Sequence, residues 1–197
     1  MKSPEDVVGA PTLEAAFPAH LADDVRCVLA VVPESTLAPV QPFAVDVQGE
    51  TVLVPSRIYP DEPAAPAVGR LTPVQQVILH CLYSRHHDGR VRQRHVERIL
   101  PSNAAWVAPF VVQLAGEYVV EIIDAVRRGL PELVTPGSDQ CRLYGEFLAR
   151  NPAFLALTER RVVSYWDCYY RGKYSTFSTY PGAVLIEEFR TAVAEHV

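Results

Sequence analysis

Proline divides this 197-residue chain into two parts of different character near residue 70. Ten of the 17 prolines lie within residues 1–70. Because proline lacks a backbone N–H and is poorly tolerated inside helices, the first third is expected to form extended segments and turns, whereas the rest is free to form helices. The sequence therefore predicts an α+β fold that is predominantly α-helical. A small N-terminal antiparallel β-element is expected to precede a packed helical array.

Charge also differs between the two parts. The first 70 residues carry ten acidic and four basic side chains, whereas the chain as a whole has a net charge of −5. Hydrophobic residues make up 49% of the sequence, which suits one globular domain and argues against disorder. The expected parts are a loosely ordered N-terminal segment (1–24), a small β-element (25–59), a Pro-rich connector (60–70) and a helical domain (71–197), with 25–197 forming one folding unit.

Two patterns predict the β-element. Residues 25–32 form a β-branched, apolar run that ends at Pro33, and residues 43–47 alternate with residues 52–54 across a short turn. In the second part, Thr72, Pro73 and Gln75 predict a helix start with a capping box, and the helix is expected to break near residues 86–89. Apolar periodicity predicts further helices at about 93–100, 106–128, 139–150, 154–171 and 183–196.

The cysteines and the chain start bear on the compartment. Cys27, Cys81, Cys141 and Cys168 form no CxxC pair, so they are interpreted as free thiols. Residues 1–6 carry acidic side chains where a secretory signal needs a basic start. Prolines also interrupt the longest uncharged stretch, residues 99–116, so no membrane-spanning segment is predicted. We expect a cytoplasmic protein.

An arginine- and histidine-rich segment, residues 85–98, is the most unusual local feature. Sixteen of the 18 basic residues of the chain are arginine, and a guanidinium binds phosphate or carboxylate through two parallel hydrogen bonds. The candidate anion-binding residues are Arg85, Arg90, Arg92, Arg94 and Arg98. They predict a nucleic acid or another phosphorylated or acidic ligand as the partner. The alternative is an exposed helix whose arginines pair with the acidic first third.

A helix-turn-helix would make DNA binding more specific, with Gln93, Arg94 and Arg98 presented by its second helix. Such motifs need a turn of about three or four residues, whereas the expected break covers roughly residues 85–92. A strand at residues 89–92, packed on the N-terminal sheet, is the competing interpretation.

A second cluster combines His86, His87, Asp88 and His95, which are suitable donors for a transition metal. The His87-Asp88 dipeptide resembles that of metal phosphohydrolases, although His80 and Asp124 do not fit the rest of that pattern. The alternative function is therefore a metal-dependent hydrolase that uses His86, His87, Asp88 and Glu121. A solvated turn is the simpler interpretation, and no metal or other cofactor is expected.

Glu117 and Glu121 are four residues apart on the expected helix 106–128, where they would lie on one side. Buried carboxylates need partners, which the arginine-rich segment can supply. Structural ion pairs are the first interpretation, and a general acid/base pair is the alternative.

Aromatic residues gather near the C-terminus, and the candidate aromatic surface consists of Tyr165, Trp166, Tyr169, Tyr170 and Tyr174. Rings beside arginines can stack on bases, sugars or a partner peptide, but they can equally fill a core.

No nucleophile elbow, phosphate-binding glycine loop or dinucleotide fingerprint is present, so the sequence carries no positive sign of an enzyme. We therefore expect a binding or adaptor protein that engages an anionic partner through residues 85–98 and the aromatic surface. A structural subunit that mediates protein–protein interaction is a further alternative.

Overall fold

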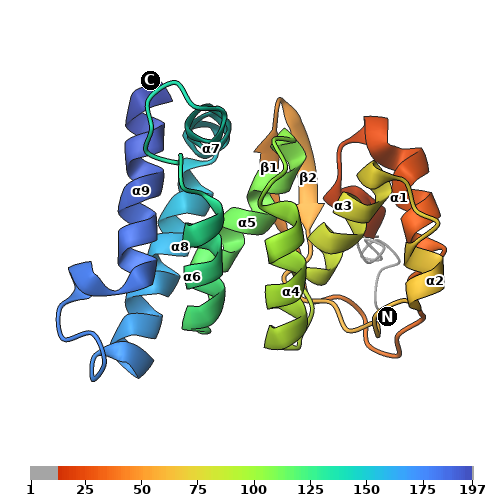
Figure 1. The fold of residues 1–197 in the computed structure, drawn as a ribbon, viewed down its shortest axis with the longest axis horizontal. Coiled ribbons are helices and arrows are strands. Elements are labelled where there is room, and N and C mark those ends of the chain that lie inside the picture. The colour runs from red at the N-terminus through yellow and green to blue at the C-terminus, as the bar shows by residue number, and fades with distance from the viewer. Residues whose placement is uncertain (1–12, 197) are drawn as a thin grey trace, which may run out of the picture.

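The computed structural model describes residues 13–196 and is predominantly α-helical, which confirms the predicted fold class. Within that part of the chain, nine α-helices accompany one two-stranded antiparallel sheet. Figure 1 shows two groups of elements. One contains the hairpin and α1 to α4, and the other contains α6 to α9, with α5 (Ala108–Ala115) running between them.

The segment predicted as a first strand, residues 25–32, is helical up to Leu29 and then turns, so that prediction is wrong. Two short 3₁₀ turns (Leu13–Ala16 and Ala19–Leu21) lead into α1 (Ala22–Leu29). Asp23 and Asp24 lie in its first turn, where carboxylates stabilise a helix N-terminus, while Val25 and Val28 are buried on one face. Packing of that face against α3 outweighs the β preference of valine.

Residues 13–24 of the N-terminal segment that was expected to be loosely ordered contain two 3₁₀ turns and the start of α1. Phe17 is buried and stacks on Phe110 of the central helix, with 5.3 Å between ring centroids. Residues 1–12 of that expected segment lie outside the described residues.

The predicted hairpin is confirmed, although its second strand begins earlier than expected. Strand β1 (Phe43–Val47) pairs antiparallel with β2 (Glu50–Val54). The two turn residues, Gln48 and Gly49, have φ angles of 54° and 91°. A two-residue turn with positive φ at both positions matches the right-handed twist of a hairpin, so the strands pair up to Val47 and Glu50.

The connector contains a short helix, α2 (Ala65–Val68), and ends at α3 (Pro73–Tyr83), whose predicted capping box between Thr72 and Gln75 is present. Helix α4 (Gly89–Ile99) starts four residues before the predicted helix, because the Asp88 carboxylate accepts hydrogen bonds from the first two backbone amides beyond Gly89. The alternative strand at residues 89–92 is therefore wrong. The break between the helices covers only residues 84–88.

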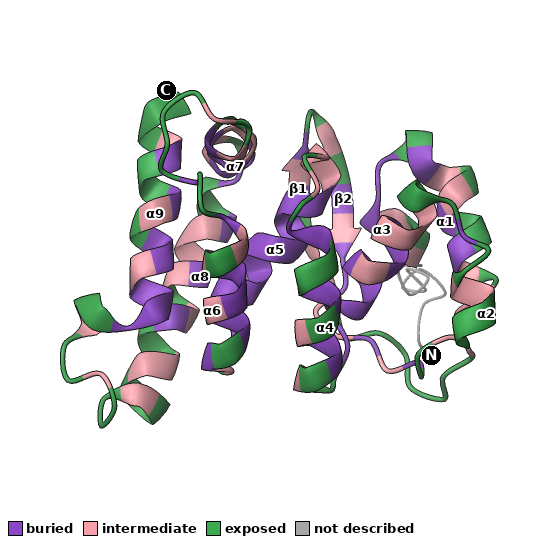
Figure 2. Ribbon diagram, in the orientation of Figure 1, coloured by how far each residue is buried: buried purple, intermediate pink, exposed green. Residues whose placement is uncertain are grey.

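The long helix predicted over residues 106–128 is divided into a 3₁₀ turn (Ala105–Val107), α5 and α6 (Val120–Gly129). Every residue of α5 is buried, as its colour in Figure 2 shows. The division follows Gly116, where an added Cβ would lie 3.3 Å from the Arg161 side chain. The chain turns at this close approach, and the turn takes Glu117 into the interior.

The C-terminal helices agree closely with the prediction. Helix α7 (Asp139–Arg150) packs along α9 (Pro181–His196), and α8 (Pro152–Tyr165) continues into a π-helical turn (Trp166–Tyr170). A 3₁₀ turn (Phe177–Thr179) precedes α9.

All four cysteines are free thiols, as predicted. Among the described residues, none of the helices has the length and apolar character needed to cross a bilayer.

Candidate functional site

The arginine-rich segment is split between the interior and the surface. Arg85 and Arg92 are 1% and 0% exposed, whereas Arg90, Arg94 and Arg98 are exposed on α4. Arg85 and Arg92 therefore do not belong to the external anion-binding surface that the sequence suggested. Both guanidinium groups are instead directed toward the buried carboxylate of Glu117, which explains why the two arginines lie in the interior.

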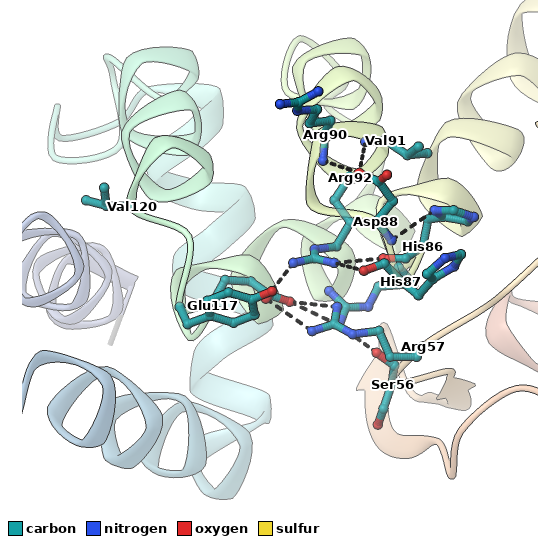
Figure 3. Close-up of polar contacts among 12 residues, drawn as sticks. Ser56, Arg57, His86, His87, Asp88, Arg90, Val91, Arg92, Glu117 and Val120 are labelled. Atoms are coloured by element: carbon teal, nitrogen blue, oxygen red, sulfur yellow. Dashed lines mark hydrogen bonds and ion pairs between the residues drawn. The ribbon is translucent and has the colours of Figure 1, made fainter. Parts of the chain in front are cut away.

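Glu117 is the centre of a buried arginine cluster, formed with Arg57, Arg85 and Arg92 (Figure 3). Arg57 donates hydrogen bonds of 3.0 and 3.2 Å to the two carboxylate oxygens. Arg92 donates to Oε2 at 3.3 Å, and the Arg85 guanidinium lies 3.6 Å from Oε1. The predicted ion pairing of Glu117 with the arginine-rich segment is therefore confirmed.

Backbone carbonyls complete this cluster. Arg85 donates to the carbonyls of Pro55 and Ser56, and Arg92 donates to those of His86 and His87 at 2.9 Å. These bonds tie the segment after the hairpin to the turn between α3 and α4. The cluster thus joins the first third of the chain to the helical part.

The charges of this cluster do not balance, because three guanidinium groups share one carboxylate. Burial alone would raise the pKa of Glu117, but the charges of Arg85, Arg57 and Arg92 hold it below its usual value. Burial also lowers the pKa of Arg85 to about 9, although Glu117 opposes this shift. Within the described residues, the buried Arg85 Nη1 and Arg92 Nε have no hydrogen-bond acceptor. Glu117 is thus the main compensation for buried positive charge.

An open basin of about 480 Å³ lies between α2, α3 and α4, and we call it the histidine basin. Its ionisable lining residues are Glu62, His80, Arg94, His95 and Arg98. His80 is on α3, the last three are on α4, and Glu62 comes from the connector before α2. Helix α4 therefore presents one face to the buried arginine cluster and another to the basin.

A chain of hydrogen bonds crosses the histidine basin from Glu62 through His95 to His80. His95 Nε2 lies 2.8 Å from Glu62 Oε1, and the Nδ1 atoms of His95 and His80 are 2.8 Å apart. Tyr83 stacks on the His95 ring with 5.1 Å between centroids and donates its hydroxyl proton to the carbonyl of Asp61. These contacts hold the His95 ring in one orientation.

Burial favours the neutral form of both histidines. Burial lowers the pKa of His80 to about 4, and the neighbouring His95 and Arg98 act in the same direction. Burial also lowers the pKa of His95, against the opposing effect of Glu62. Burial disfavours ionisation of Glu62, yet the hydrogen bond from His95 and the charge of Arg94 bring its pKa below the usual value. Glu62 is therefore ionised at pH 7.

The two arginines that line the histidine basin differ in whether a carboxylate pairs with them. Arg94 forms an ion pair with Glu62 Oε2. Within residues 13–196, the Arg98 side chain forms no ion pair and no hydrogen bond. Of the candidate anion-binding residues, Arg98 is thus the one with a free guanidinium group in the histidine basin.

The structure does not bring the four residues of the proposed metal site into one group of ligands, although the His86 and His87 rings lie in contact, with 4.2 Å between centroids. His86 is buried against Tyr83 and His87 stacks on Tyr59, while Asp88 and Glu121 border a different depression, together with Arg90. In the described part of the chain, no group of three or more His, Cys, Asp or Glu is arranged to hold a metal ion. Glu117 and Glu121 do not share a helix face either, since Glu117 precedes α6 and is buried while Glu121 is exposed.

The candidate aromatic surface is divided as well. Trp166 donates to the carbonyl of Tyr174 in the loop before α9, and Tyr170 donates to the carbonyl of Tyr118 before α6, so these two rings hold separate segments in place. Tyr165 is half-buried, and Tyr169 is 69% exposed. The aromatic residues follow α8, whereas the histidine basin lies in the other group of helices (Figure 1), so the two regions do not form one surface.

Sequence reasoning named Arg94, Arg98 and His95 but missed Glu62 as a site residue and gave His80 no role of its own. The spacing of His80 and His95 offers no local signal, because the two residues lie on different helices whose packing is set by apolar faces. Glu62 follows Pro60 and Asp61 in the connector and is brought to α4 only by the tertiary fold.

Comparison with known proteins gives no match. No family model, curated protein or solved structure is similar to this chain at a significant level.

Proposed function

We propose that this protein binds a small anionic ligand, phosphorylated or otherwise acidic, in the histidine basin. The observation that supports this most directly is Arg98, which lines the basin and whose side chain pairs with no carboxylate of residues 13–196. A guanidinium presents a planar fork of donors that fits phosphate and carboxylate oxygens. An unpaired one at the wall of a concavity is a suitable contact for an anion.

The shape of the molecule favours a small ligand over a nucleic acid. A basin of about 480 Å³ falls within the usual range of small-molecule sites, about 300–1,000 Å³. Arg90, by contrast, borders a separate depression that also contains Asp88 and Glu121, and two carboxylates there oppose a phosphate backbone. The exposed arginines of α4 therefore do not form one continuous basic track.

A titration of the full chain with inorganic phosphate, followed by backbone amide NMR shifts, tests the proposal. We expect shifts to concentrate on α3 and α4 around His80 and Arg98. Arg98→Gln should weaken phosphate binding by about tenfold, the loss expected for a charge-assisted hydrogen bond. Arg90→Gln is the matched control, since it removes the same charge from the same helix outside the histidine basin.

Two outcomes would contradict this proposal. The first is a lack of saturable shifts at the histidine basin, and the second is an equal loss of affinity in both variants, which indicates diffuse charge attraction only. Anisotropy of labelled single-stranded and duplex DNA across a salt series tests the nucleic-acid alternative. About four phosphate contacts would give a logarithmic slope near −3 to −4.

A further inference from the structure

The hydrogen-bond chain of the histidine basin fixes where its protons lie. Each oxygen of Glu62 already has a partner, since Oε1 contacts His95 Nε2 and Oε2 contacts Arg94. An ionised carboxylate can only accept hydrogen bonds, so the short contact to Oε1 requires a proton on His95 Nε2. A neutral imidazole carries one proton, and His95 Nδ1 is therefore a hydrogen-bond acceptor.

The same reasoning extends to His80. Its Nδ1 lies 2.8 Å from His95 Nδ1, and two lone pairs at this distance would repel each other, so His80 Nδ1 must carry the donated proton. His80 Nε2 is then left with a lone pair. His80 lines the histidine basin, and its Nε2 has no hydrogen-bond partner within residues 13–196. Glu62 thus determines, through two rings, that the Nε2 atom of His80, a residue that lines the basin, is a hydrogen-bond acceptor.

The histidine basin therefore combines the donors of Arg98 with an acceptor on His80. An oxyanion without protons offers acceptors only, so it would place a lone pair against His80 Nε2. An oxyanion that keeps an O–H group satisfies both sides, because its O–H donates to His80 while its other oxygens accept from the arginine. A site with a fixed acceptor discriminates in this way because the wrong ligand leaves a polar group unpaired.

We propose that the histidine basin selects oxyanions that carry an O–H group, such as hydrogen phosphate or a monoprotonated phosphate monoester, over acceptor-only oxyanions such as sulfate. This inference rests on the proposed anion-binding function and specifies its ligand class. His80 is the residue that confers the selectivity. Glu62 and His95 are positioning residues that act through it.

Phosphate and sulfate form the natural pair of probes, because both are tetrahedral and differ in the O–H group at neutral pH. We would titrate the full chain with each anion at constant ionic strength at pH 7, following amide NMR shifts. Wild-type protein should bind phosphate at least about tenfold more tightly than sulfate, the size of one satisfied hydrogen bond. His80→Phe keeps a ring of similar shape without the acceptor, and it should reduce this preference to less than about threefold. Arg90→Gln, outside the basin, should keep the preference unchanged.

The imidazole nitrogen shifts supply a second readout that does not depend on ligand affinity. We expect His80 in the Nδ1–H form and His95 in the Nε2–H form, and Glu62→Gln should disturb both. If wild-type protein binds the two anions equally, the selectivity is refuted while anion binding stands. If neither anion binds, the proposed function itself fails. A phosphate preference that survives in a folded His80→Phe protein would also overturn the role of His80.

Discussion

The buried arginine cluster and the histidine basin are built on two faces of the same helix, yet they use their charges in opposite ways. Around Glu117, three guanidinium groups are held by a carboxylate and by backbone carbonyls, and two of them, those of Arg85 and Arg92, are buried. In the basin, one carboxylate is fully engaged and Arg98 is left free among the described residues. The arginines of residues 85–98 therefore have two roles. Buried ones hold separate parts of the fold together, and exposed ones line a candidate binding site. Burial decides which role each arginine has.

The largest effect is expected from removing the carboxylate of the buried cluster. Glu117→Gln keeps the shape of the side chain but leaves three guanidinium groups without a counter-charge, so it should lower the free energy of unfolding by about 3 kcal/mol or more. Urea unfolding measures this loss. Glu121→Gln, at an exposed position of the next helix, is the control and should change stability by less than about 0.5 kcal/mol. Similar losses for the two variants would show that the buried arginine cluster does not stabilise the fold.

A second test compares one arginine from each region. Arg92→Met leaves the carbonyls of His86 and His87 and one oxygen of Glu117 without their buried donor, so we expect a loss of about 2 kcal/mol. Arg94→Met removes a surface ion pair, and its effect on unfolding should stay within about 0.5 kcal/mol. The same urea experiment reports both values. A larger loss for Arg94→Met than for Arg92→Met would show that the surface ion pair stabilises the fold more than the buried arginine does.

A third test concerns the pH dependence of stability. The pKa of His80 falls from 6.5 to about 4 on folding, so between these values the unfolded chain binds more protons than the folded one. Stability should therefore decrease as the pH falls from about 6.5 to 4, and His80→Phe should reduce this decrease. Thermal unfolding at several pH values from 7 to 4 measures the slope. Parallel slopes for the two proteins would show that His80 is not held neutral by the fold.

Local signals in the sequence predicted elements whose causes are themselves local. The capping box at Thr72 and Gln75 and the alternation on either side of Gln48 and Gly49 depend on neighbouring residues, and both appear as expected. Residues 25–32 were predicted wrongly because the packing of one valine face on α3 outweighs a weak intrinsic preference. The division of the long helix at Gly116 has a similar cause, since it depends on the approach of Arg161 from a distant helix.

The sequence by itself determined that this is a predominantly helical α+β chain with a small hairpin, free thiols and a concentration of arginine and histidine near residues 85–98. Only the tertiary structure decided that Arg85 and Arg92 are internal, that Arg98 faces a basin, and that His80 joins His95 and Glu62. The physical reason is that composition and periodicity fix which side chains must be buried or capped. The pairing of charges from separate elements depends instead on how their apolar faces pack.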